Sequence, residues 1–340
     1  MSAGIEGRLT AAWRTRGLTA FLLFPLSLIF ALLATLRRCA YRWGLRPVHR
    51  LPVPVVVVGN ITAGGAGKTP LTLYLAQHLQ ALGRRPGIIS RGYGRRRDAV
   101  DEVRLTSDVA DVGDEPLLLR QRAGCPVFVG RDRAAAGRAL LAAHPECDLI
   151  LCDDGLQHYA LARDVELAVL DRRGLMNGWR LPAGPLRESP RRLTGVDAVV
   201  LNGGGPLVVP HATVFRMWLQ AEPCYRLDDA TQTCDVQALR GLRLHAVAGI
   251  GEPQRFFDQL AALGLTCVPH AFPDHHAYCS ADLDFDGDAI LTTEKDAVKF
   301  APFLAALPAG KPIWVLPVAA GLEPDLARFV LEKINGFPPA

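Results

Sequence analysis

The sequence lacks several patterns that would place it in a metal-binding, disulfide-bonded or nucleic-acid-binding class. Its 8 cysteines include no C-x-x-C pair and follow no regular spacing, so neither a zinc site nor a disulfide framework is expected. The histidines and cysteine near residues 270–279 match no standard zinc spacing either. Because zinc-finger spacing and aromatic RNA-binding stretches are also missing, we expect no nucleic-acid partner. These absences favour a reduced, cytosolic chain.

Charge is absent from residues 18–36, which as a helix would extend about 28 Å, close to the thickness of a bilayer core. Arginines and aromatic residues flank both ends of this stretch, as at a membrane interface. No small-residue cleavage site follows it, which disfavours a signal peptide. A buried core helix is the alternative. Pro25 can kink the helix, so the sequence leaves open whether it spans the membrane or lies in one leaflet.

The bulk composition predicts a folded protein with an anionic partner. With 340 residues, 49% hydrophobic and 21% charged, the chain can bury a core and divide into two lobes. The formal charge of +4 is carried largely by arginines in short runs. Such clusters favour phospholipid or phosphosugar as partners.

Residues 53–69 predict a strand, a phosphate-binding loop and the start of a helix. The β-branched run 53–58 is typical of a parallel strand covered on both faces, and Pro70 suits the first turn of a helix. The glycines of the loop allow consecutive N–H groups to point at phosphate oxygens. Lys68 would reach the β and γ phosphates, and Thr69 would bind Mg²⁺.

One position departs from the usual phosphate-loop pattern, because Thr62 stands where glycine is expected. The alternative interpretation is a glycine-rich surface turn with an exposed lysine. The agreement of strand, Gly-Lys-Thr sequence and helix favours a nucleotide site instead. We expect its cofactor, ATP, to contact Thr62, Ala63, Gly64, Gly65, Ala66, Gly67, Lys68 and Thr69.

A second apolar strand, residues 147–152, ends in Asp153 and Asp154, as in a Walker B strand. Carboxylates at this place would hold Mg²⁺ beside Thr69, directly or through water. Which of the two touches the metal directly stays open. Gln157 and His158 follow in the same loop and are candidates for the substrate side.

Three further loops carry candidate residues. The strand at residues 87–90 runs into a basic loop at residues 91–97, where ligand contact and a solvated charge run are equally good explanations. Arg187 lies in a long loop rich in proline and glycine, and would bind a phosphate. Asp114 precedes a leucine-rich helix, where capping alone would explain it.

The predicted fold class is α/β: a P-loop NTPase-type, mostly parallel sheet with a second, smaller α/β lobe and an N-terminal hydrophobic membrane helix. The expected division is a membrane-associating segment at residues 1–50, a P-loop core at 51–210 and the second lobe at 211–340.

Together these segments resemble the tetraacyldisaccharide 4′-kinase family, LpxK, of lipid A biosynthesis. The resemblance covers nearly the whole chain, and a threonine or serine stands at the Thr62 position in that family. It rests on the apolar N-terminal stretch and on seven motifs: residues 59–70, Ser90-Arg91-Gly92-Tyr93, Gly113-Asp114-Glu115-Pro116, Asp153-Asp154-Gly155-Leu156-Gln157-His158, residues 181–188, Phe272-Pro273-Asp274-His275 and Thr293-Glu294-Lys295-Asp296.

The resemblance implies transfer of the ATP γ-phosphoryl group to the 4′-hydroxyl of an acylated disaccharide 1-phosphate, at the cytoplasmic face of the inner membrane. It implies that Asp114 and His275 form a catalytic dyad, with Lys68 steadying the γ-phosphate. His275 would arrive from the second lobe, and closure would complete the site. A monomer in contact with membrane lipids is expected. The residues implied for substrate contact are Arg91, Tyr93, Gln157, His158 and Arg187.

Two other functions remain possible on the residues alone. A membrane-attached P-loop ATPase or GTPase switch acting on a protein partner would use the same loop, although the chain has no Asn-Lys-x-Asp guanine motif. The Phe-Pro-Asp-His element also has no evident use in a switch. A basic membrane-binding module with a vestigial loop would require Asp114 and His275 to be incidental.

Overall fold

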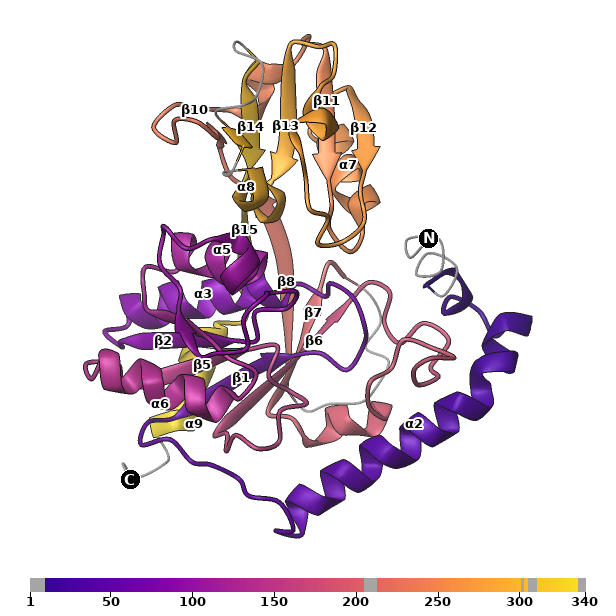
Figure 1. Cartoon of the computed structure of the whole chain (residues 1–340), viewed down its shortest axis with the longest axis vertical. Coiled ribbons are helices and arrows are strands. Elements are labelled where there is room, and N and C mark those ends of the chain that lie inside the picture. Colours follow the sequence, from indigo (N-terminus) through magenta and orange to yellow (C-terminus); the bar gives the residue numbers. More distant parts are fainter. Residues whose placement is uncertain (1–9, 205–212, 301–302, 305–310, 336–340) are drawn as a thin grey trace.

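The computed structural model describes residues 10–204, 213–300, 303–304 and 311–335. Two sheets, each combined with helices, form a large lobe and a small lobe. Figure 1 shows the small lobe above the large one, with β8 (Val214–Ala221) and β15 (Val318–Glu323) running between them.

The large lobe contains a nine-stranded sheet in the order β15-β8-β7-β6-β1-β5-β2-β4-β3. The strands are parallel except at the two edges, where β15 and β3 run antiparallel to their neighbours. All residues of β1, β2 and β5 are buried, as expected for parallel strands covered on both faces. The remaining bounds are β1 (Val55–Gly59), β2 (Pro86–Ser90), β3 (Asp101–Glu102), β4 (Val127–Val129), β5 (Leu149–Asp153), β6 (Val165–Asp171) and β7 (Ala198–Asn202).

Helices cover both faces of the large sheet, and β1 shows why. Its side chains alternate, so that Val56 and Val58 face one apolar core while Val55 and Val57 face the other. The first core is completed by α3 (Lys68–Ala81), α5 (Asp114–Arg122) and α9 (Leu326–Asn335). The short helix α4 (Val109–Val112) directly precedes α5. The second core is completed by α6 (Arg133–Ala143) and by residues 156–196, which include the 3₁₀ turn Pro190–Gly195.

The small lobe contains a six-stranded sheet in the order β10-β9-β14-β13-β11-β12. Its four strands β11 to β14 are mutually parallel, and β9 and β10 add an antiparallel edge. Helix α7 packs on β11 and β12, whereas α8 packs on α5 of the large lobe. The bounds are β9 (Cys224–Arg226), β10 (Thr233–Cys234), β11 (Leu244–Ala248), α7 (Pro253–Ala262), β12 (Cys267–Ala271), β13 (Ala289–Thr293), α8 (Glu294–Phe300) and β14 (Ile313–Leu316), with 3₁₀ turns at Val236–Leu239 and Ser280–Leu283.

The chain crosses between the lobes twice, which differs from the division expected at residues 210 and 211. That boundary itself lies outside the described residues. Strand β8 belongs to the large sheet, and β15 returns from the small lobe to pair with it, Val318 opposite Ala221. Helix α9 then packs on α3. The small lobe is therefore an insertion between two strands of the large sheet.

Helix α2 (Leu18–Arg42) runs along the side of the large lobe (Figure 1). Judged by length and composition alone, α2 is long and apolar enough to cross a membrane. Its apolar side chains are mostly exposed, with Leu22 at 71% and Leu33 at 61%, so it is not a buried core helix. A narrow stripe faces the lobe, where Ser27 Oγ donates to the Arg180 carbonyl at 2.8 Å.

Candidate functional site

The phosphate-binding loop lies between β1 and α3, as the sequence predicts. Gly67 precedes α3 with φ +95°, and a Cβ there would lie 2.3 Å from Asn202 Nδ2. That amide donates to the Ala66 carbonyl at 3.0 Å, so the loop passes close to the end of β7. Only glycine permits both this φ angle and this approach. The loop can therefore wrap its backbone around an anion at the start of α3.

Thr62, the unusual residue of the loop, has a structural partner. It forms an antiparallel bridge with Leu186, and the neighbouring Ala63 N donates to the Pro185 carbonyl at 2.8 Å. Thr62 is 6% exposed. The loop is thus attached to the segment 181–188, and an extended residue suits this bridge better than a flexible glycine.

Lys68 and Asp154 meet at the carboxyl ends of β1 and β5. Lys68 Nζ lies 3.6 Å from Asp154 Oδ1 and 3.5 Å from Asn60 Oδ1. Burial disfavours the charge of Asp154, but Lys68 and Arg187 outweigh it, so the pKa of Asp154 lies below its ordinary value. Asp154 also has φ +49°, a backbone conformation that is uncommon outside glycine. An ionised carboxylate and an ammonium therefore face the space above the loop.

Asp153 is fully buried beside Asp154. Its Oδ1 accepts from Thr72 Oγ1 at 3.2 Å, whereas its Oδ2 has no hydrogen-bond partner within the part of the chain that the structure describes. Burial and the charges of Glu115 and Asp154 raise the pKa of Asp153 to about 7. Its free oxygen is available as a ligand for a cation.

Asp114 and His275 are in contact across the two lobes, although 161 residues separate them. His275 Nδ1 lies 2.9 Å from Asp114 Oδ2 and 3.1 Å from Oδ1. Asp114 is 4% exposed and is the first residue of α5; Gly113, with φ +93°, caps the helix, so capping does not explain Asp114. Instead, Asp114 Oδ1 accepts from the Glu115 N–H at 2.8 Å.

The two groups shift each other's ionisation in opposite directions. Burial disfavours both charges, but the hydrogen bond between the two groups outweighs it together with neighbouring charges, of which Lys295 acts on Asp114 and Asp274 on His275. The pKa of Asp114 is consequently lowered and the pKa of His275 raised, so the contact favours a carboxylate paired with an imidazolium.

Lys295 makes a second bridge between the lobes beside this dyad. Its Nζ lies 2.9 Å from Glu115 Oε1 and 3.0 Å from Asp274 Oδ1. Burial disfavours the ammonium, but Glu115 and Asp114 raise the pKa of Lys295 above its ordinary value. Glu115 lies in the Gly-Asp-Glu-Pro motif and Lys295 in the Thr-Glu-Lys-Asp motif, but the sequence analysis gave neither residue a role. Their spacing in the chain, 180 residues, hides the contact.

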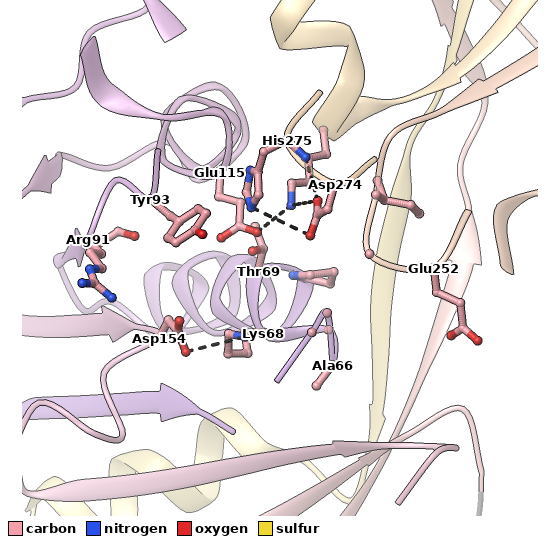
Figure 2. A pocket seen from close by; sticks show the side chains of 18 of the residues that line it. Ala66, Lys68, Thr69, Arg91, Tyr93, Glu115, Asp154, Glu252, Asp274 and His275 are labelled. Carbon is pink, nitrogen blue, oxygen red and sulfur yellow. Dashed lines mark hydrogen bonds and ion pairs between the residues drawn. The ribbon is translucent and has the colours of Figure 1, made fainter. Parts of the chain in front are cut away.

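One cavity of about 1250 Å³ holds these groups together. Figure 2 shows Lys68 and Asp154 on one side, His275, Asp274 and Glu115 on the other, and Thr69 between them. Asp114 and Asp153 are buried behind this lining. Phe30, Leu33 and Arg37 of α2 line the same cavity, so it extends from the phosphate loop to the apolar helix. The residues expected to contact substrate all line it: Arg91, Tyr93, Gln157, His158 and Arg187.

These five residues differ in how free they are to bind. The Tyr93 ring packs on His275 at 5.0 Å and is 63% exposed. Arg187 lies 3.4 Å from Asp154, and Gln157 Nε2 donates to the Asn60 carbonyl at 2.9 Å. Burial and Arg133 lower the pKa of His158 to about 4, so this imidazole is neutral at pH 7. His158 can thus donate or accept a hydrogen bond but supplies no positive charge to a phosphate.

Arginines on the lining were also missed by sequence reasoning. Arg131 lines the cavity just before α6 and Arg133 as its first residue, and the sequence analysis gave neither a role. Arg255 lines it from the small lobe and donates to Asn202 Oδ1 at 3.1 Å. The short arginine runs in the sequence signalled an anionic partner, but these three arginines lie outside those runs, and only the fold brings them to the cavity.

The family model described as tetraacyldisaccharide-1-P 4′-kinase, LpxK, matches residues 19–335 of this chain. The chain belongs to this family. A tetraacyldisaccharide 4′-kinase of Azoarcus sp. is 54% identical over 332 residues, covering 96% of each chain. One of Dechloromonas aromatica is 55% identical over 326 residues, covering 95% of each chain.

A solved structure shares the fold. LpxK from Aquifex aeolicus, described as an "apo" form in complex with ATP, superposes with a TM-score of 0.80 at 28% identity, covering 93% of this chain and 100% of that chain. The predicted family and the predicted fold class are thereby confirmed. So is the prediction of an α/β chain with an apolar N-terminal helix.

Proposed function

We propose that this chain is an ATP-dependent lipid kinase that phosphorylates the 4′-hydroxyl of a tetraacyldisaccharide 1-phosphate, a lipid A precursor. Family membership supports the reaction, and the ATP complex of the Aquifex aeolicus protein supports the phosphoryl donor. The observation that carries the proposal is the Asp114–His275 contact, in which His275 lines the same cavity as the phosphate loop and the apolar helix and Asp114 is buried behind it. A phosphate donor and an acylated alcohol would meet there.

Positioning supplies most of the rate in phosphoryl transfer, because the transition state is loose and needs little covalent help. In the proposed site the loop N–H groups and Lys68 hold the triphosphate, and the ammonium of Lys68 neutralises charge on the transferring group. Arg91 and the arginines of the lining would bind the acidic parts of the two substrates. The chain then needs only one acceptor for the hydroxyl proton.

Asp114 is proposed as that acceptor, with His275 orienting it. A carboxylate of lowered pKa is a weak base, but a loose transition state releases the proton late, when the oxygen is already bonding to phosphorus and has become acidic. His275 holds one oxygen of Asp114 at 2.9 Å and stabilises the charged form until transfer occurs. The other oxygen is fixed by the Glu115 N–H.

The residues beside the loop fit Mg²⁺. Asp153 offers a buried oxygen without a partner among the described residues, and Asp154 and the Thr69 hydroxyl lie at the same end of the loop. Oxygen ligands of this kind, two of them carboxylates, are those Mg²⁺ prefers. When bound, Mg²⁺ would neutralise charge on the phosphate oxygens.

We further propose that α2 lies in the cytoplasmic leaflet of the inner membrane and that the enzyme acts as a monomer. The stripe of α2 facing the lobe runs through residues 20, 24, 27, 31 and 35, and Arg180 donates to the Ala31 carbonyl at 2.9 Å. The polar side chains Ser27 and Thr35 lie in this stripe, so the opposite, apolar face is the one offered to lipid. Contact along its length favours a helix lying beside the lobe over one crossing the bilayer.

The test is phosphate transfer from labelled ATP to the purified acylated disaccharide in mixed micelles. The proposal predicts ATP consumption that requires the lipid and matches the phosphorylated lipid formed. ATP hydrolysis that proceeds equally well without the lipid, with no labelled lipid, would support the switch alternative and contradict the proposal.

A further inference from the structure

A cluster of three charged side chains joins the lobes at the far end of α5 from the dyad. Arg122, the last residue of α5, donates one guanidinium nitrogen to Glu294 and another to Glu222. Glu294 is the first residue of α8 in the small lobe and is 6% exposed. Glu222 directly follows β8, the strand that leads into the small lobe. The cluster therefore joins a helix of each lobe to one connecting strand.

The second connecting strand is attached to the same cluster. The remaining oxygen of Glu294, Oε2, accepts from the Val318 N–H at 3.3 Å, at the start of β15. The Glu222 N–H donates to the Pro317 carbonyl at 3.0 Å. Through these two glutamates, Arg122 is connected to the end of β8 and the start of β15, the two strands by which the chain passes between the lobes. A change in the angle between the lobes would have to break or rebuild these contacts.

Helix α5 is held to the small lobe at both of its ends. Its first residues contact the small lobe through Asp114 with His275 and Glu115 with Lys295, and its last residue does so through Arg122. The helix has 9 residues and is about 13 Å long, so the two attachments are well separated. One attachment would leave the helix free to tilt about it, whereas two fix its direction.

We propose that Arg122 is a positioning residue for phosphoryl transfer: through α5 and α8 it fixes the lobes so that Asp114 meets His275 at hydrogen-bond distance. The proposal rests on the proposed function, because it assigns Arg122 a role only through the dyad. Arginine suits the task, since its planar fork can hold two carboxylates at once, whereas lysine is a point charge.

The removal of Arg122 would leave the buried Glu294 without its cation. Burial already raises the pKa of Glu294, and Arg122 is the chief group that opposes this rise. Without the guanidinium, Glu294 would be a buried, unpaired charge, and α8 would shift to hydrate it. Because α8 continues with Lys295, which bonds both Glu115 and Asp274, the shift would reach the residue next to His275.

The experiment compares Arg122→Gln with Arg120→Gln, a change of the same kind on the same helix but outside the cluster. Arg122→Gln is expected to lower kcat about 10²-fold, the effect of displacing a catalytic contact by about 1 Å, with a smaller change in KM for ATP. Arg122→Lys should recover part of the loss, and Arg120→Gln should stay close to the parent. Equal activity of the two glutamine variants would overturn the proposal.

A second background separates positioning from a loss of folded protein. With His275→Gln already present, Arg122→Gln should lower kcat little further, because the contact it protects is gone. If Arg122→Gln lowered kcat by the same factor in both backgrounds, the proposal would be overturned. If Arg122→Gln does not fold, Glu222→Gln replaces it, since that side chain is 39% exposed. An unimpaired His275→Gln enzyme would instead refute the dyad of the proposed function.

Discussion

The two lobes contribute to the cavity in different ways. The large lobe supplies one continuous stretch of the lining, residues 64–70 with Lys68 among them, besides separate side chains such as Asp154 and Arg187. The small lobe supplies separate side chains from the ends of its strands, such as His275 after β12 and Lys295 after β13. In the proposed mechanism, nucleotide binding is therefore local to the large lobe, whereas proton transfer depends on how the lobes are placed.

Each lobe holds one candidate site residue in the left-handed backbone region. Asp154 in the large lobe has φ +49° and His275 in the small lobe has φ +59°. For residues other than glycine this conformation costs about 1 kcal/mol or more and persists where the surroundings impose it. His275 is the third residue of the turn 273–276, which the His276 N–H closes by donating to the Pro273 carbonyl at 3.1 Å, and its side chain contacts Asp114 and Tyr93 across the lobe boundary. The comparison predicts that changes in the large lobe abolish binding and transfer together, while changes at the boundary affect transfer alone.

The largest effect is expected for Lys68→Ala. Loss of this ammonium should lower transfer about 10³-fold or more and weaken ATP binding, because the same group holds the triphosphate and neutralises the transferring charge. Kinetics with ATP and the lipid acceptor, with an independent nucleotide-binding measurement, check both. Lys333→Ala is the control, since that ammonium pairs with Asp197 on the large lobe at 3.2 Å. Near-normal transfer would remove the loop from the mechanism.

Asp114→Ala should separate transfer from binding. We expect kcat to fall about 10²- to 10⁴-fold, the usual contribution of a proton acceptor, with ATP affinity nearly unchanged. Asp111→Ala, a partly exposed carboxylate one turn earlier that pairs with Arg96 and Arg97, is the matched control. An equal loss of binding and transfer would mean that Asp114 acts on the fold of the large lobe.

Helix α2 is a third region, for which we propose membrane attachment. A triple variant in which serine replaces the exposed residues Leu22, Leu26 and Ile29 should be released from phospholipid vesicles without a change in ATP binding. In detergent micelles, kcat should stay close to that of the parent. Leu242→Ser, at an exposed position of the small lobe, should leave vesicle binding unchanged. Triple-variant protein that stays on the vesicles would refute the anchor.

The smallest effect concerns the pH dependence of stability at the boundary. The folded pKa of His275 is raised, so its contribution is complete below the ordinary value of about 6.5 and is lost as pH rises through the raised value. The deficit in unfolding free energy of His275→Gln, about 2 kcal/mol near pH 6, should therefore shrink towards pH 9. Chemical denaturation at both pH values measures it, and Asp114→Asn should abolish the pH dependence. A deficit that grows with pH would contradict the assigned ion pair.

What the sequence could and could not predict follows the same division. The phosphate loop and the carboxylates after β5 are short-range patterns, and both lie where expected. The return of β15 to the large sheet was missed, because Val318–Glu323 carries a glycine and two alanines and little strand signal, and pairing with β8 decides its place. The contacts of Arg122 with Glu294 and of Lys295 with Glu115 each join residues more than 170 positions apart, which no local pattern reveals.

Asp114 shows how residue patterns and tertiary structure combine. Its position at a helix start made capping a sufficient explanation from the residues, and only the resemblance suggested a dyad. The structure assigns the cap to Gly113 and puts Asp114 against His275 in the boundary. The catalytic role of the pair stays a prediction.

The most direct test of the central claim is a crystal structure of the full chain with Mg²⁺, a nonhydrolysable ATP analogue and the acylated disaccharide 1-phosphate. The account predicts the γ-phosphate at Lys68, and the 4′-hydroxyl both in line with it and about 3 Å from a carboxylate oxygen of Asp114 that His275 also contacts. A 4′-hydroxyl seated beyond hydrogen-bond reach of Asp114, with the two lobes closed around both substrates, would contradict it.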